Sequence, residues 1–306
     1  MKLSGIISYP ITPFSADERS INFDVLGETL ERLLQNGSDA IAPLGSTGES
    51  AYLSLEEWRQ VADFTVKTVS GRVPVIVGIS ELTTLQAISK ARYAQSIGAD
   101  AVMIIPVSYW KLTQKEIFNY YQEISESISL PIMVYNNPAT SGIDMSPELL
   151  VQMFNEIDNV TMVKESSGDI QRMHKLYALS SGKLPFFNGS NPLALEALCA
   201  GASGWCTAAP NLIGKKPKAL YQSVAAGQLD EAREIFYQQL PMLNFIVSGG
   251  IPKAIKAGLV LKGIAAGLPR RPLRGATVEE ITLLQSLMDS QSQGVEEALI
   301  SSYQTI

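Results

Sequence analysis

The sequence predicts a (β/α)8 barrel of the TIM type, followed by a helical extension. Eight short apolar runs alternate with longer amphipathic segments. In a sheet with one face in water, polar and apolar residues alternate along each strand, and these runs show no such alternation. We therefore expect a parallel sheet that helices cover on both faces. Beyond residue 212 the apolar runs stop, while helical periodicity continues. We therefore expect the barrel over residues 1–212 and the extension over residues 213–306 of the same domain.

The predicted strands begin 19 to 35 residues apart, which leaves room for a helix and two loops in each unit. Eight such units favour a closed barrel over an open, doubly wound sheet. Residues 36–43 and 97–104 share a pattern in which a glycine closes a helix before a short loop and a buried strand. The predicted strands are residues 5–9, 40–44, 74–79, 101–106, 131–135, 160–164, 185–187 and 204–207.

The helices between these strands have recognisable start signals. Ser54 with Glu57, and Thr113 with Glu116, have the spacing of a capping box, in which two side chains satisfy free backbone N–H groups. Ser146 precedes a proline that suits the first helical position. The helices predicted for the extension are residues 215–226, 229–247, 252–266 and 277–303.

The composition narrows the functional classes. The 306 residues carry a net charge of −6, two cysteines and one histidine. Nucleic-acid binding is disfavoured because it needs clustered Lys and Arg. The residue counts exclude a disulfide framework and a Cys-rich or three-histidine zinc site. No apolar run approaches the ~20 residues of a membrane-spanning helix, and the first residues do not resemble a targeting signal. We expect a cytoplasmic protein without a metal, nucleic-acid or membrane partner.

Polar residues at the carboxyl ends of barrel strands are candidates for the active site. The loop Gly45-Ser-Thr-Gly-Glu49 follows the second predicted strand. Its two glycines allow a tight turn that brings backbone N–H groups close to a ligand, and Ser46 and Thr47 add hydroxyl groups. Such a loop suits a carboxylate or phosphate, although a plain turn would have the same composition.

Lys164 ends the sixth predicted strand, on the same face as Val160 and Met162. Apolar surroundings disfavour the charged form of an amine. This matters because an ordinary lysine is only ~0.04% neutral at pH 7, and only the neutral amine is a nucleophile. The alternative is a lysine that forms a structural ion pair at the mouth of the barrel.

Two tyrosines also fall near strand ends. Tyr135 ends the fifth predicted strand, and Tyr109 follows the fourth. Either hydroxyl could carry protons, or either ring could be a packed aromatic side chain. Among the other reactive residues, His174 is expected to be structural on a charged helix, and Cys199 is expected to be a small buried hydrophobic residue.

Taken together, five motifs resemble the dihydrodipicolinate synthase/N-acetylneuraminate lyase family. They occur in the order and spacing of that family, and the resemblance covers essentially the whole chain. The motifs are Thr12-Pro-Phe14, Gly45-Ser-Thr-Gly-Glu49, Tyr135-Asn-x-Pro138, Val163-Lys-Glu-Ser-Ser-Gly-Asp169 and Asn188-Gly189.

The resemblance implies a class I mechanism, in which Lys164 forms a Schiff base with pyruvate or another 2-oxo acid. Ser46, Thr47 and the backbone at Gly48 would bind the substrate carboxylate, and Thr47 would belong to the catalytic set. Tyr135 would carry protons to and from the imine and the substrate hydroxyl.

The resemblance also implies an oligomer, because Tyr109 matches a family tyrosine that reaches into the site of a neighbouring subunit. A homodimer or homotetramer is expected. Gly189 and Cys206 would line the pocket mainly with backbone atoms. No cofactor is expected, because the imine with Lys164 is itself the electron sink.

The motifs depart from both named enzymes. Thr140 stands where dihydrodipicolinate synthases have an arginine for the second carboxylate, and Ser190-Asn-Pro192 stands where sialic acid lyases have aromatic and acidic residues. We therefore expect a hydroxylated 2-oxo acid, such as a 2-keto-3-deoxy sugar acid, as the substrate. The residues expected to select it are Thr140, Ser166, Ser190 and Asn191.

Three other functions stay open at this stage. A Schiff-base enzyme could remove water or ammonia from a 2-oxo acid as a hydro-lyase or deaminase. The chain could be a lysine-pathway dihydrodipicolinate synthase. It could also be a non-catalytic barrel, since a fold does not determine a function.

Overall fold

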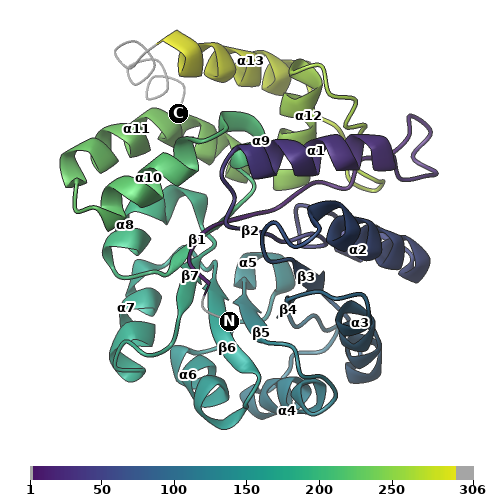
Figure 1. Cartoon of the computed structure of the whole chain (residues 1–306), viewed down its shortest axis with the longest axis vertical. Helices are drawn as coiled ribbons and strands as arrows, with labels where there is room; N and C mark the ends of the chain where they lie inside the picture. The colour runs from purple at the N-terminus through teal and green to yellow at the C-terminus, as the bar shows by residue number, and fades with distance from the viewer. Residues whose placement is uncertain (1–2, 294–306) are drawn as a thin grey trace.

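The computed structural model describes residues 3–293 and has an eight-stranded parallel sheet. The strand order is β2-β1-β8-β7-β6-β5-β4-β3, and a parallel bridge between Ile41 and Val75 joins the two ends of the sheet. The strands thus form a barrel with an outer ring of helices (Figure 1). The predicted fold class is confirmed.

Each of the eight predicted apolar runs forms a strand. Most boundaries differ from the prediction by one or two residues. The exception is β2, because the chain leaves the strand early and Leu44 adopts a left-handed conformation with φ of 63°. The strands are β1 (Gly5–Ser8), β2 (Ala40–Ile41), β3 (Ile76–Ile79), β4 (Ala101–Ile104), β5 (Ile132–Asn136), β6 (Val160–Glu165), β7 (Phe186–Asn188) and β8 (Gly204–Thr207).

The barrel helices begin where the capping signals predict. Both capping boxes are present, at Ser54 and at Thr113, and the Ser146 side chain accepts a hydrogen bond from Leu149 N. The helices are α1 (Phe23–Gln35), α2 (Leu55–Val69), α3 (Thr84–Ser96), α4 (Gln114–Ser125), the short α5 (Pro138–Ser141), α6 (Pro147–Glu156), α7 (Ile170–Leu179) and α8 (Ala194–Cys199).

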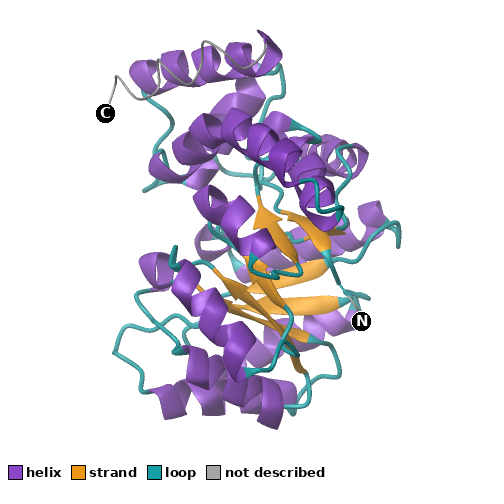
Figure 2. Ribbon diagram, turned by 90° about the vertical axis from the view of Figure 1, so that its left-hand side faces the viewer, coloured by secondary structure: helices purple, strands orange, loops and turns teal. Residues whose placement is uncertain are grey.

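The helical extension packs on one side of the barrel, next to α1 and α8 (Figures 1 and 2). The third predicted helix is too long, because α12 ends shortly before Gly263, whose φ is 81°. The part of the last predicted helix beyond residue 293 lies outside the described residues. The elements are α9 (Pro210–Ile213), α10 (Lys216–Ala225), α11 (Leu229–Ser248), α12 (Ile251–Leu261) and α13 (Val278–Gln293).

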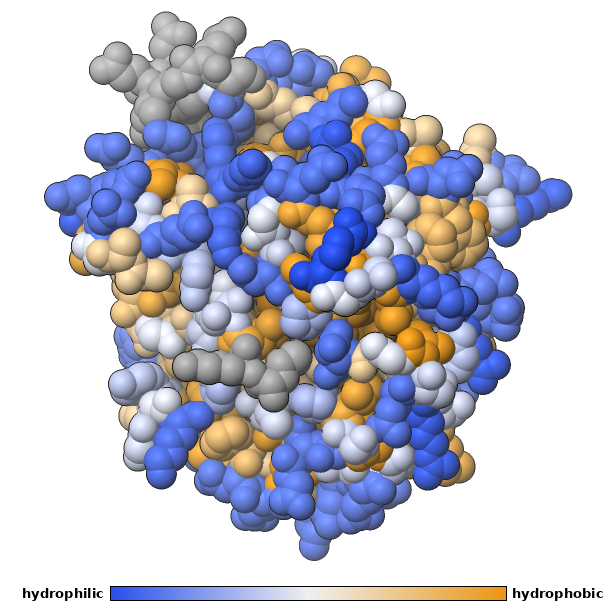
Figure 3. Space-filling view, viewed as in Figure 1, coloured by the Kyte–Doolittle hydropathy of each residue, from blue (hydrophilic) through white to orange (hydrophobic). Residues whose placement is uncertain are grey.

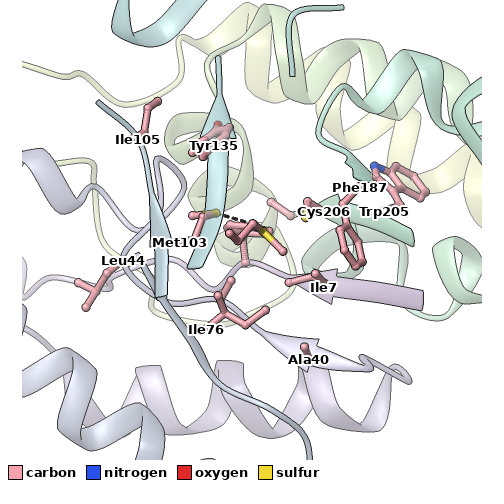
Figure 4. Packing of buried hydrophobic residues seen from close by; sticks show 14 of the residues in the cluster. Ile7, Ala40, Leu44, Ile76, Met103, Ile105, Tyr135, Phe187, Trp205 and Cys206 are labelled. Atoms are coloured by element: carbon pink, nitrogen blue, oxygen red, sulfur yellow. Dashed lines mark hydrogen bonds between the residues drawn. The ribbon is translucent and has the colours of Figure 1, made fainter. Parts of the chain in front are cut away.

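Side chains from all parts of the barrel form one apolar core, part of which is shown in Figure 4. The face seen in Figure 1 is mainly hydrophilic, with separate hydrophobic patches (Figure 3). No helix in residues 3–293 is long and apolar enough to cross a membrane. The prediction for Cys199 is wrong, since this residue is exposed at the end of α8. The core-facing residues of that short helix are Ala194, Ala197 and Leu198.

Candidate active site

A cavity of about 550 Å³ opens at the carboxyl ends of the barrel strands. It lies between the loops that follow these strands and the first residues of α12. Several predicted site residues lie on its wall, which brings together segments that are far apart in the sequence. These residues are Ser46, Tyr135, Thr140, Ser166, Gly189, Ser190 and Asn191.

Lys164 adjoins this cavity from the end of β6, and its side chain is only 6% exposed. Its Nζ lies 3.8 Å from the centroid of the Tyr135 ring and 4.1 Å from that of the Tyr9 ring. No ion pair joins Lys164 to a carboxylate within residues 3–293. The surroundings are therefore aromatic rather than acidic, unlike those of a structural ion-paired lysine.

Gly189 leaves the space that the Lys164 side chain needs. A Cβ atom at this position would lie 1.7 Å from Ser166 Oγ and 2.9 Å from Lys164 Cε. Both distances are far shorter than a van der Waals contact, so a larger residue would displace one or both side chains. The Asn188-Gly189 motif thus needs a glycine at its second position, because a side chain there would clash with Ser166 and Lys164.

The Tyr135 hydroxyl lies in a network suited to proton transfer. Asn137 Nδ2 donates a hydrogen bond to it over 2.8 Å. Burial acts to raise the pKa of Tyr135, but the nearby Lys164 ammonium and hydrogen bonds with Asn137, Ser46 and Lys164 outweigh it and lower that pKa. A phenol with a lowered pKa gives up its proton more readily, which is what a proton carrier requires.

The loop after β2 is a compact turn. Gly48 N donates to Gly45 O over 3.0 Å, and Thr12 Oγ1 donates to Gly48 O over 2.7 Å. Ser46 lies on the cavity wall, and its side chain helps to lower the pKa of Tyr135. Thr47 is buried and lies off the wall. Of the two hydroxyl residues, Ser46 is therefore the one that lies on the cavity wall together with Tyr135.

A buried ion pair fixes the end of this loop to the extension. Glu49 Oε1 lies 2.6 Å from Lys256 Nζ, with the two side chains 0% and 1% exposed. Glu49 Oε2 accepts from the backbone N of Arg270 over 2.7 Å, and Lys256 Nζ donates to Leu268 O over 3.0 Å. Glu49 itself has an unusual φ of 55°, so its contacts hold a backbone conformation that glutamate rarely adopts.

Three further predicted site residues lie off the cavity wall. Gly48 forms the turn described above. Cys206 is buried deeper in the barrel, where burial raises the pKa of its thiol. Tyr109 is 91% exposed on the loop after β4, beside Trp110, which is 79% exposed. Within one chain, the structure thus leaves Tyr109 outside the site.

Comparison with known proteins identifies the family. A family model described as the dihydrodipicolinate synthetase family matches residues 2–291. This chain belongs to that family. Its members are lyase-type enzymes whose reaction uses a Schiff base between pyruvate and a lysine.

Individual relatives agree with the family model. The chain is 32% identical over 284 residues to a 4-hydroxy-tetrahydrodipicolinate synthase from Methanopyrus kandleri. The aligned region covers 93% of this chain and 95% of the Methanopyrus enzyme. It is also 32% identical to the Bacillus subtilis enzyme of the same name, over a region that covers 94% of this chain and 98% of that enzyme.

The solved structures show the same barrel. A candidate dihydrodipicolinate synthetase from Pseudomonas aeruginosa is 54% identical and superposes with a TM-score of 0.93, covering 95% of this chain and all of that one. The dihydrodipicolinate synthase from Thermotoga maritima is 27% identical, with a TM-score of 0.91 and coverage of 95% and 99%.

Sequence reasoning missed part of this site. Asn137 lies within a quoted motif, but nothing in the sequence indicates that it binds the Tyr135 hydroxyl. Nothing in the sequence indicates that Lys256 forms a buried ion pair. Its partner Glu49 lies far away in the sequence, in the loop after β2. The residues described in the structure contain no group of three or more His, Cys, Asp or Glu side chains that could hold a metal ion.

Proposed function

We propose that this enzyme is a class I lyase that forms an imine between Lys164 and pyruvate, or the pyruvate part of a hydroxylated 2-oxo acid. A 2-keto-3-deoxy sugar acid is an example of such a substrate. The observation that supports the proposal best is the buried Lys164 amine against the Tyr135 ring, next to a cavity that could hold the substrate. No cofactor takes part in this scheme.

In the cleavage direction, the neutral amine of Lys164 adds to the C2 carbonyl of the substrate, and water leaves to give the imine. Tyr135 takes the proton of the C4 hydroxyl as the C3–C4 bond breaks. The electron pair of that bond moves into the protonated imine, which becomes an enamine, and an aldehyde leaves. Protonation at C3 and hydrolysis by water then release pyruvate and restore Lys164.

The loop that carries Ser46 would hold the pyruvate carboxylate, with Thr47 and Gly48 supporting its turn.

The names of the relatives favour a second candidate, a 4-hydroxy-tetrahydrodipicolinate synthase. It would use the same imine, but for condensation rather than cleavage. A hydro-lyase or deaminase would share the imine as well. Product analysis separates these reactions, because cleavage gives pyruvate and an aldehyde, whereas loss of water or ammonia leaves the carbon skeleton intact.

The imine itself can be trapped. We expect borohydride reduction in the presence of pyruvate to add one reduced pyruvate to the chain, located on Lys164 by peptide mass spectrometry. The Lys164→Ala variant should gain nothing. Failure of pyruvate and other small 2-oxo acids to give an adduct on the wild-type enzyme would refute the Schiff-base proposal.

A second prediction concerns Gly189. The Gly189→Ala variant should form the trapped imine about 100-fold more slowly, because displacing a reacting group by about 1 Å has effects of this size. Gly27→Ala is a matched control, since the added Cβ would make an ordinary 3.5 Å contact with Phe64 on a remote helix. Equal trapping rates in the two variants would contradict the packing argument.

We also propose that the active enzyme is a homodimer or homotetramer. A tyrosine and a tryptophan that are mostly exposed side by side are unusual on the surface of a monomer. A neighbouring subunit would cover them and receive the Tyr109 hydroxyl near its own Lys164. Sedimentation velocity at assay concentration should show this oligomer, and a fully active monomer would exclude the shared site.

A further inference from the structure

The wall of the cavity carries almost no charge. Among its lining residues in the described part of the chain, only Glu49 is charged, and its side chain is fully buried in the pair with Lys256. Two cations of the extension close to the wall are paired elsewhere. Lys253 pairs with Glu280, and Arg270 Nη2 lies 2.7 Å from Glu57 Oε1. A second carboxylate or a phosphate would find no cation on this wall.

Two buried hydroxyl groups on the wall have no partner. Ser50 Oγ and Ser166 Oγ make no hydrogen bond with any residue of the 3–293 segment. An unpaired buried hydroxyl costs stability, so a ligand oxygen that bonds to it gains affinity. Ser166 adjoins the Lys164 side chain at Gly189. Its hydroxyl is therefore close to where the bond would break or form.

The rest of the wall is uncharged: besides the polar residues Ser80, Asn137, Thr140, Ser141, Ser190 and Asn191, it has two apolar parts. One part comes from the ends of β3 and β4 and the loops after them, and the other from the extension. The apolar residues in the two parts are Ile79, Met103, Ile105 and Val107, and Val247, Ile251, Pro252 and Leu273. An uncharged chain would bury apolar surface here, whereas an anionic one would lose its hydration without compensation.

We propose that the carbonyl partner of pyruvate at this site is an uncharged aldehyde with an apolar chain, in preference to the hydroxylated aldehyde that a sugar acid would release. This inference rests on the proposed Schiff-base function and specifies its substrate class. In the condensation direction, C3 of the enamine forms a bond to the aldehyde carbon. The aldehyde oxygen takes the Tyr135 proton and becomes a hydroxyl group, which Ser166 can bind. The apolar chain then lies against Ile105, Ile251 and Leu273.

The test compares two aldehydes of matched length, butanal and 4-oxobutanoate, which differ by a terminal methyl or carboxylate group. Each is incubated with pyruvate and wild-type enzyme, and the 4-hydroxy-2-oxo acid product is quantified by mass spectrometry. We expect kcat/KM to be at least ~10-fold higher for butanal, because the wall offers no cation for the carboxylate. Glyceraldehyde and its 3-phosphate form a second neutral and anionic pair and should show the same order. Butanal should also react faster than glyceraldehyde, whose hydroxylated chain buries less apolar surface.

A charge variant tests whether the wall causes this preference. Val247 is on the apolar wall and 47% exposed, so the fold should tolerate a cation there. Val247→Arg should lower the butanal to 4-oxobutanoate ratio by roughly 10-fold, while the uncharged Val247→Gln should change it much less. A ratio that is the same in both variants would show that wall charge does not select the substrate.

The outcomes separate this inference from the proposed function. Absence of a borohydride-trapped pyruvate adduct would refute the function, and the substrate class with it. If the adduct forms but 4-oxobutanoate reacts as well as butanal, only the inference about the aldehyde is wrong. It is equally wrong if the adduct forms and neither neutral aldehyde condenses, or if glyceraldehyde reacts faster than butanal.

Discussion

Replacing Tyr135 by phenylalanine should lower turnover by ~10²–10⁴-fold, the usual contribution of a positioned proton carrier. The variant keeps the aromatic ring whose centroid lies 3.8 Å from Lys164 Nζ, so the lysine should stay in place. It loses only the hydroxyl group to which Asn137 Nδ2 donates a hydrogen bond. Imine formation with pyruvate should therefore remain measurable by borohydride trapping, while bond cleavage becomes slow.

Tyr9 provides a matched control for this prediction. Its ring also faces Lys164 Nζ, at 4.1 Å, but its hydroxyl donates to Met103 Sδ over 3.0 Å, and burial raises the pKa of Tyr9 well above the ordinary value. Tyr9→Phe removes a hydroxyl from the same lysine environment without removing a proton carrier. If Tyr9→Phe lost as much turnover as Tyr135→Phe, the proton-carrier role would have to be abandoned.

The sequence predicts the parts of this enzyme that depend on local patterns. Parallel strands buried on both faces give continuous apolar runs, so every strand could be placed. Because active sites in such barrels form at the carboxyl ends of strands, Lys164 and Tyr135 could also be placed. Their motifs then point to the family that the comparisons confirm.

Features that depend on long-range packing could not be predicted. The sequence shows two hydroxyl residues in the loop after β2, but not that Ser46 faces the cavity while Thr47 is buried. It also gives no sign that Cys199 is on the outer side of a six-residue helix. The pair between Glu49 and Lys256 joins two segments whose contact depends on how the extension packs on the barrel.

This buried pair leads to the second prediction of large effect. Lys256→Met should lower the free energy of unfolding by about 3–5 kcal/mol, because the Glu49 carboxylate is left buried without its countercharge. Urea denaturation would measure the change. Lys253→Met is the control on the same helix, since its pair with Glu280 is partly exposed and should contribute no more than about 1 kcal/mol. Similar losses in the two variants would contradict the argument.

The double variant Glu49→Gln/Lys256→Met distinguishes the cost of an unpaired buried charge from the role of the ion pair in positioning the loop after β2. It removes both charges while keeping similar side-chain volumes, so it should recover much of the stability lost in Lys256→Met, because an uncompensated buried charge costs more than a lost ion pair. The stable double variant would then lack the ion pair that tethers the loop after β2 to α12. If the tether positions Ser46 for the pyruvate carboxylate, the KM for pyruvate should stay raised in the stable double variant. A normal KM in that variant would limit the pair to a role in folding.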